Sequence, residues 1–176
     1  VAEFKEAIRL KPDYAEAHTN LGIFYQILGM YEKAIAELKE AIRLQSDYVK
    51  AHYNLGLLYD KLGRNQEAIN EYKETIRLKP IHAEARANLG ISYQALGLYD
   101  KAVTELKEAL RARPEHAESH ISLGVSYGKL GMYEEALAEF KEAIRIQADY
   151  FQAHYNLGLV YGKLGRDEEA ITEYKK

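Results

Sequence analysis

Apolar residues in this chain recur three or four positions apart over two successive runs, at 15–28 and 31–44. In the first run Leu21, Tyr25 and Leu28 share one face, and the second run repeats the spacing. This period is typical of amphipathic helices, whereas apolar residues in strands alternate. The two runs therefore predict two helices of roughly 14 residues, each about 21 Å long at a rise of 1.5 Å per residue. We refer to them as helix A and helix B.

The helix pair returns with a fixed period. The string Asn-Leu-Gly begins at residues 20, 54, 88 and 156, and Ser122-Leu123-Gly124 fills the remaining place, so the spacing is always 34 residues. A period of this length predicts a solenoid of stacked helix pairs. We expect one array over 1–176: a half-repeat helix B at 1–14, full repeats at 15–48, 49–82, 83–116 and 117–150, and an incomplete fifth repeat at 151–176.

Repetition explains most of the glycine content, since ten of the 12 glycines stand at two repeat positions. Gly22 and its copies lie inside helix A, where glycine costs up to about 1 kcal/mol relative to alanine. We expect helices A and B to approach closely there, against Ala34 and its copies. Gly29 and its copies follow helix A and predict a left-handed residue that ends it. Asp13 and Glu16 have the spacing of a capping box before the first helix A.

Composition excludes several classes of function. The chain has no cysteine, which removes disulfides, thiolate metal sites and cysteine nucleophiles. Its net charge of −3 and pI of about 6.1 argue against nucleic acid as a partner. No apolar run approaches the length of a bilayer span and no signal-peptide pattern opens the sequence. We therefore expect no membrane insertion, with the cytoplasm weakly favoured as the compartment.

Catalytic and metal-binding motifs are not convincing. His116, Glu118 and His120 do not form H-E-x-x-H, because the glutamate stands one place late. The segment Gly124–Leu130 is one residue short of a P-loop and lies inside a predicted helix. There is no G-x-S-x-G sequence. We expect no enzyme activity, no metal and no cofactor.

The repeat resembles the tetratricopeptide repeat (TPR) family, whose motif runs W-x₂-L-G-x₂-Y, then A-x₃-F, A and P. The first repeat supplies the matching residues Leu21, Gly22, Tyr25, Ala34, Leu38 and Ala41. The tryptophan position differs throughout and holds His18, His52, Arg86, His120 and His154. The resemblance implies an all-α, right-handed α-solenoid of antiparallel helix pairs, and a non-catalytic scaffold that binds a protein or peptide.

In a TPR-like superhelix, the side of helix A that points away from helix B lines a concave groove. Asparagine recurs there, and its amide can donate and accept hydrogen bonds to an extended backbone. An apolar stripe runs beside the asparagines, as on many binding surfaces. Alternatively, asparagine is ordinary repeat consensus and the superhelical curl covers the stripe. The predicted peptide-binding residues are Asn20, Ile23, Tyr53, Asn54, Leu57, Lys61, Asn88, Ile91, Val125, Lys129, Tyr155, Asn156 and Leu159.

The groove asparagines are similar to those in the TPR arm of O-GlcNAc transferase, which holds extended polypeptide. By contrast, only the central asparagine of the basic carboxylate clamp of chaperone-binding TPRs has a match here. We therefore expect no binding of chaperone C-terminal acidic tails.

Two other functions stay open. Val1, Phe4 and Ile8 at one end, and Ile171 and Tyr174 at the other, belong to helices without a polar capping helix, which suggests a self-associating assembly or spacer array. The chain could also be the substrate-recruiting arm of a larger enzyme.

The outer side of helix B carries Glu–Arg pairs such as Glu40–Arg43, which we interpret as a solvated face.

Overall fold

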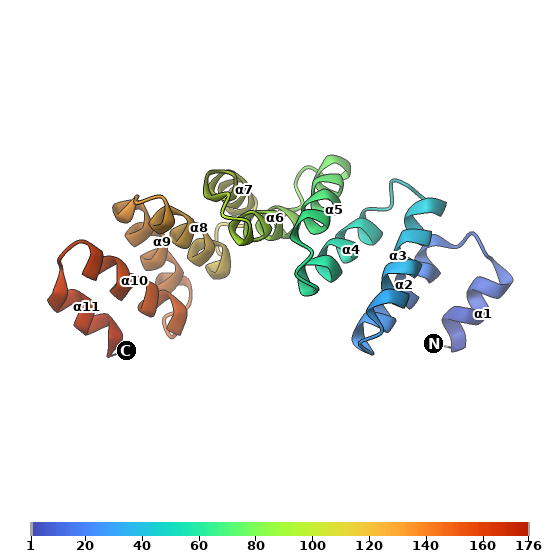
Figure 1. Cartoon of the computed structure of the whole chain (residues 1–176), viewed down its shortest axis with the longest axis horizontal. Helices are drawn as coiled ribbons and strands as arrows, with labels where there is room; N and C mark the ends of the chain where they lie inside the picture. Colours follow the sequence, from blue (N-terminus) through green and yellow to red (C-terminus); the bar gives the residue numbers. More distant parts are fainter. Residues whose placement is uncertain (1, 176) are drawn as a thin grey trace. The chain divides into compact units, whose positions relative to one another are not determined.

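Helices joined by short turns make up the part of the chain that the computed structural model describes, residues 2–175 (Figure 1). No strand occurs in that range. The helices equivalent to helix A are α2 (Ala15–Ile27), α4 (Val49–Lys61), α6 (Ala83–Ala95), α8 (Ala117–Lys129) and α10 (Phe151–Lys163). The helices equivalent to helix B are α1 (Ala2–Leu10), α3 (Tyr31–Leu44), α5 (Asn65–Leu78), α7 (Tyr99–Ala112), α9 (Tyr133–Ile146) and α11 (Asp167–Tyr174). Val1 lies outside the described residues.

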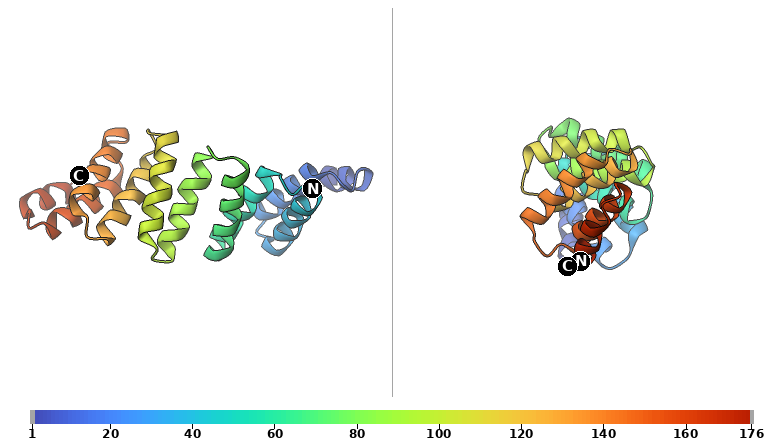
Figure 2. Two further views of the ribbon diagram at one scale, coloured as in Figure 1. Left: turned by 90° about the horizontal axis from the view of Figure 1, so that it is seen from above. Right: turned by 90° about the vertical axis from the view of Figure 1, so that its left-hand side faces the viewer.

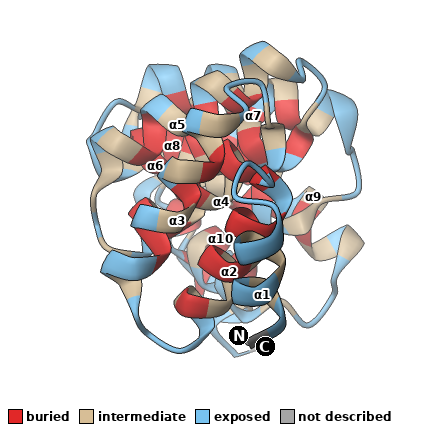
Figure 3. Cartoon of the chain, turned by 90° about the vertical axis from the view of Figure 1, so that its right-hand side faces the viewer, coloured by how far each residue is buried: buried red, intermediate tan, exposed pale blue. Residues whose placement is uncertain are grey.

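The predicted all-α fold of adjacent antiparallel helix pairs is confirmed. Within each pair the apolar stripe of one helix meets the stripe of the other, as the spacing of apolar residues requires. Leu21 of α2 is 2% exposed, and Ala34 and Leu38 of α3 are fully buried. Figure 3 shows this distribution: the buried residues lie within the helices, and the turn residues are exposed or half-buried.

The turn after helix A has the geometry that its glycine predicts. Gly29 has a φ of +71° and follows Leu28, the C-cap of α2. Its N–H donates to the Gln26 carbonyl at 3.1 Å, and the Met30 N–H donates to the Tyr25 carbonyl at 2.9 Å. These two bonds form a Schellman motif, which a residue with a Cβ would adopt only with strain.

The capping-box prediction for Asp13 and Glu16 is wrong. The N-cap of α2 is Tyr14, and no side chain bonds to the free N–H groups of its first turn. Backbone carbonyls accept instead: the Ala15 N–H donates to Asp13 and the Ala17 N–H to Tyr14, at 3.1 and 3.0 Å. The Glu16 carboxylate accepts a hydrogen bond from the Tyr14 hydroxyl at 3.0 Å, and it does not reach back to a backbone N–H group as a capping box would require.

Helices A and B approach each other closely at the glycines inside helix A, as expected. A Cβ built on Gly22 would stand 2.9 Å from Leu38 Cγ, and one on Gly56 would stand 2.7 Å from the Tyr72 ring. The nearest neighbour is therefore the large apolar residue of helix B. Ala34, the expected partner, contributes its backbone carbonyl at 3.2 Å.

The chain divides into two compact units, Val1–Ala85 and Arg86–Lys176, with the boundary inside α6. In the first unit α2 packs on α3 and α4 on α5, and in the second α8 packs on α9 and α10 on α11 (Figure 2). Each unit also brings two A helices into contact, α2 with α4 and α8 with α10. Consecutive A helices therefore present their outward sides next to each other within each unit.

None of the described helices is long and apolar enough to cross a membrane.

Candidate binding face

The predicted binding residues all stand on the A helices, and we call the surface that they share the open face; Tyr53 and Tyr155 lie at its edge, against Tyr72 and Tyr174 of the B helices. Its asparagines and apolar residues are half-buried, and Leu159 is 44% exposed. The adjacent packing residues are different: Leu55 and Leu157 are at most 2% exposed. The half-buried members are Asn20, Ile23, Tyr53, Asn54, Leu57, Asn88, Ile91, Val125 and Asn156, whereas Lys61, Lys129, Tyr155 and Leu159 are exposed.

Three of the asparagine side chains make hydrogen bonds within the protein. Asn54 Nδ2 donates to the Lys50 carbonyl at 2.7 Å, and Asn156 Nδ2 donates to the Gln152 carbonyl at 2.8 Å, each one turn earlier. Asn20 Oδ1 accepts from Lys50 Nζ at 3.0 Å, which links α2 to α4. At Asn54 and Asn156 the amide oxygen and one N–H remain for a ligand.

The two predicted tyrosines have different surroundings. The Tyr53 ring packs within the first unit, with centroid distances of 4.8 Å to His82 and 6.2 Å to Tyr72. Tyr155 is 48% exposed and stacks on Phe151 at 6.1 Å. Tyr155 also contacts the Tyr174 ring of α11 at 6.1 Å, so both tyrosines support the packing of helix A on helix B, and Tyr155 is the more exposed of the two.

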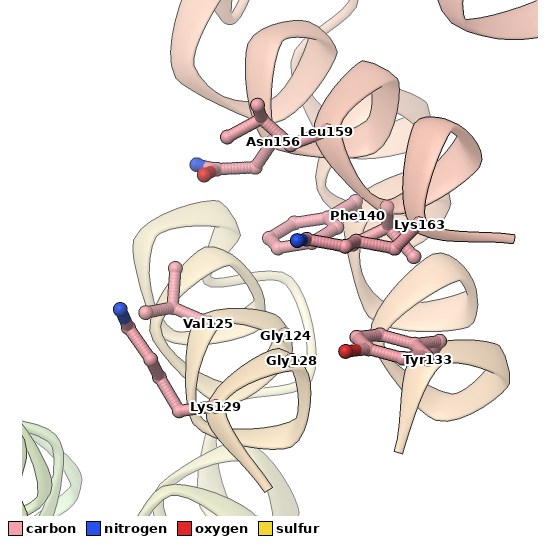
Figure 4. Close-up of a pocket in the computed structure, with 10 residues that line it drawn as sticks. Gly124, Val125, Gly128, Lys129, Tyr133, Phe140, Asn156, Leu159 and Lys163 are labelled. Atoms are coloured by element: carbon pink, nitrogen blue, oxygen red, sulfur yellow. The ribbon is translucent and has the colours of Figure 1, made fainter. Parts of the chain in front are cut away.

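A cavity of about 250 Å³ opens on the second unit between α8, α9 and α10 (Figure 4). It contains four of the predicted residues, Val125, Lys129, Asn156 and Leu159. The predicted set lacks the other lining residues, which are Gly124, Gly128, Tyr133, Phe140, Val160 and Lys163. The sequence could have pointed to Gly128, because Gly128 and Gly162 are the two glycines that do not stand at either of the two repeated glycine positions.

Sequence comparisons agree with the helix-pair geometry. Three family models match, one described as TPR repeat over residues 25–63 and 129–165, and two as tetratricopeptide repeat over 53–117 and 3–36. The chain belongs to the tetratricopeptide repeat family. A search of curated proteins found no match.

Solved structures of TPR proteins share this fold. A crystal structure of MamA is 24% identical with a TM-score of 0.88, covering 92% of this chain and 88% of that chain. YrrB, described as a TPR protein with an unusual peptide-binding site, is 23% identical with a TM-score of 0.86, covering 97% and 88%. MamA from Desulfovibrio magneticus RS-1, residues 41 to the end, is 22% identical with a TM-score of 0.87, covering 92% and 91%.

The tryptophan position of the TPR motif holds a side chain that joins helix A to helix B. At His18, His52, His120 and His154, Nδ1 lies 2.6–2.7 Å from a glutamate of the paired B helix. In the same four residues Nε2 lies 2.9–3.2 Å from a backbone carbonyl six residues earlier. Arg86 makes the equivalent bond to Glu105 at 2.7 Å.

This pairing changes the titration of two histidines. Burial lowers the pKa of His52, but hydrogen bonds to the Glu71 carboxylate and the Ser46 carbonyl outweigh it, so the pKa lies above its ordinary value. The pKa of His120 is raised in the same way, by Glu139 and the Pro114 carbonyl against burial. These histidines are occupied in packing, and the described residues contain no cluster of acidic and histidine side chains able to hold a metal ion.

The outer side of helix B has the predicted ion pairs. Glu40–Arg43, Glu74–Arg77 and Glu142–Arg145 are joined at 2.5–2.8 Å, and Glu108 bonds to Arg111. Their arginines are more than half exposed, so solvent screens these pairs and they add little to stability.

Proposed function

We propose that the chain is a non-catalytic scaffold whose open face binds an extended or helical segment of a partner protein. One observation carries the proposal: a cavity opens on this face, and four residues predicted to bind peptide line it. Clefts lined by apolar side chains with a few polar groups are the usual form of ligand sites. The cavity lies between two successive A helices, α8 and α10, and the B helix α9 closes it from behind with Tyr133 and Phe140.

The apolar and amide groups on the open face support the proposal. Ile23 and Leu57 in the first unit, and Val125 and Leu159 in the second, keep part of their surface in solvent. Neighbouring asparagines supply both a donor and an acceptor, which suits the backbone of a bound segment. The likeness to YrrB, itself described as having a peptide-binding site, points in the same direction.

The test uses peptides selected from a random-sequence display library on the immobilised whole chain. We expect the double variant Asn54→Glu/Asn156→Glu to bind these peptides at least tenfold more weakly. The substitutions replace an amide donor by a carboxylate and put two negative charges on the open face. Titration by fluorescence anisotropy measures the change, and circular dichroism confirms the helical content.

The matched control is Asn70→Glu/Thr104→Glu, which adds the same charge at two exposed positions of α5 and α7 on the other side of the helix pairs. It should bind as the original chain does. Equal binding by both double variants, or a loss in the control alone, would show that the open face is not the binding surface.

A further inference from the structure

Gly128 has no structural reason to be glycine. It stands inside α8, is not among the residues with positive φ, and a Cβ built on it would meet nothing within 4 Å. Ten other glycines either allow close helix contact or adopt a left-handed conformation. A glycine in a helix interior costs about 1 kcal/mol relative to alanine. At Gly128 that cost brings no gain in packing or turn geometry.

The same repeat position holds a bridging side chain in an earlier repeat. Gln94 of α6 donates from Nε2 to the Ser122 carbonyl at 2.6 Å and to Ser126 Oγ at 2.8 Å, both on α8. One period of 34 residues later, the equivalents of Ser122 and Ser126 are Asn156 and Val160 of α10. Both line the cavity beside Gly128. The cavity therefore occupies the place that the Gln94 side chain fills one repeat earlier.

The cavity combines apolar walls with a basic rim. Val125 and Leu159 project into it from α8 and α10, and the Phe140 ring lies behind (Figure 4). Lys129 and Lys163 are both exposed, and within the described residues neither has an ion-pair partner. Asn156 also lines the cavity, and its Nδ2 donates to the Gln152 carbonyl at 2.8 Å. A ligand with an apolar side chain and a nearby carboxylate complements this arrangement in both shape and charge.

Resting on the proposed function, we infer that this cavity, which we call the Gly128 pocket, is a specificity pocket. It receives one apolar side chain of the partner segment, and Lys129 and Lys163 pair with an aspartate or glutamate beside that side chain. The absent side chain at position 128 is what makes room for the apolar group. The pocket thus selects among the polypeptides that the open face could hold.

The test is an NMR titration of the whole ¹⁵N-labelled chain with synthetic nonapeptides. The first peptide has a central leucine flanked by two glutamates in a Gly/Ser background, the second replaces leucine by serine, and the third replaces both glutamates by glutamine. We expect the first peptide to shift the amides of Gly128, Leu159 and Lys163. We expect each of the other two to bind at least fivefold more weakly.

Gly128→Gln places into the pocket the side chain that position 94 already carries, and should weaken binding of the first peptide at least tenfold. The matched control is Gly162→Gln, the same change at the same repeat position, where a Cβ also meets nothing within 4 Å and which does not line the pocket. The control should bind normally. Glutamine is a better helix former than glycine, so neither variant should lower the melting temperature.

Three results would overturn the inference: no shift at the pocket with the first peptide, equal binding of the glutamate and glutamine peptides, or unchanged binding by Gly128→Gln. The library peptides separate these outcomes from failure of the proposed function. If they still lose affinity in the single variant Asn54→Glu, whose site lies in the first unit and does not line the pocket, the open face binds polypeptide without this pocket. If they bind equally to the double variant Asn54→Glu/Asn156→Glu, the proposed function is wrong as well.

Discussion

A histidine at the tryptophan position of a TPR motif becomes intelligible only from its hydrogen bonds. In His52 both ring nitrogens face acceptors, Glu71 Oε2 at 2.7 Å and the Ser46 carbonyl at 3.1 Å. Only the charged imidazolium can donate from both nitrogens. The sequence shows that the position is polar and periodic, but the acceptor lies 19 residues away on the next helix. A role of His52 in packing could therefore be predicted from the sequence. Its pairing with Glu71 could be seen only in the structure.

The raised pKa values of His52 and His120 predict a pH dependence of stability. Glu71 and Glu74 act on His52, and Glu139 and Glu142 act on His120; all four raise the pKa. A raised pKa in the folded state means that the stabilisation is complete below the unfolded value of about 6.5 and is lost as pH rises through the folded value. Each unit of pKa difference corresponds to about 1.4 kcal/mol.

We therefore expect the free energy of unfolding in urea to fall from pH 6 to pH 8. His52→Gln/His120→Gln should be less stable than the original chain at pH 6 and should show a shallower decline. The Arg86–Glu105 ion pair is present in both proteins. An identical pH slope in the double variant would contradict the charged-pair interpretation.

Helix pairs are the level at which the sequence was most informative. Repeated apolar spacing and the glycines after helix A predict where the A and B helices lie, and the helices begin at Ala15, Val49, Ala83, Ala117 and Phe151, the predicted repeat starts. Close approach at Gly22 was also predictable, because a helix-interior glycine requires a reason. The residue that Gly22 contacts, Leu38, could not be predicted, because it depends on the angle at which the two helices cross.

The same substitution should have opposite effects at two helix glycines. Gly56→Ala puts a Cβ 2.7 Å from the fully buried Tyr72 ring, so we expect the free energy of unfolding to fall by about 1–3 kcal/mol. Gly162→Ala meets nothing within 4 Å and should stabilise by up to about 1 kcal/mol through helix propensity. Urea denaturation measures both. Stabilisation by Gly56→Ala would show that the helix contact is looser than described.

At the scale of the whole molecule, periodicity predicts the fold because every repeat places its residues in the same local setting. The binding site is less predictable, because it depends on where repeats differ. Val125 and Leu159 could be assigned to the open face from their register, but the Gly128 pocket arises from one side chain that is missing. Self-association and attachment to an enzyme remain predictions.

Binding of polypeptide to the open face is tested most directly by cross-saturation. A library-selected, protonated peptide is irradiated while bound to the deuterated, methyl-protonated chain, and saturation is read at each methyl group. We predict the strongest transfer at the methyl groups of Leu57, Val125 and Leu159 on the open face, with little at Ile81, which is 79% exposed in a turn. Transfer concentrated at Ile81 or other methyls off the open face would contradict the account.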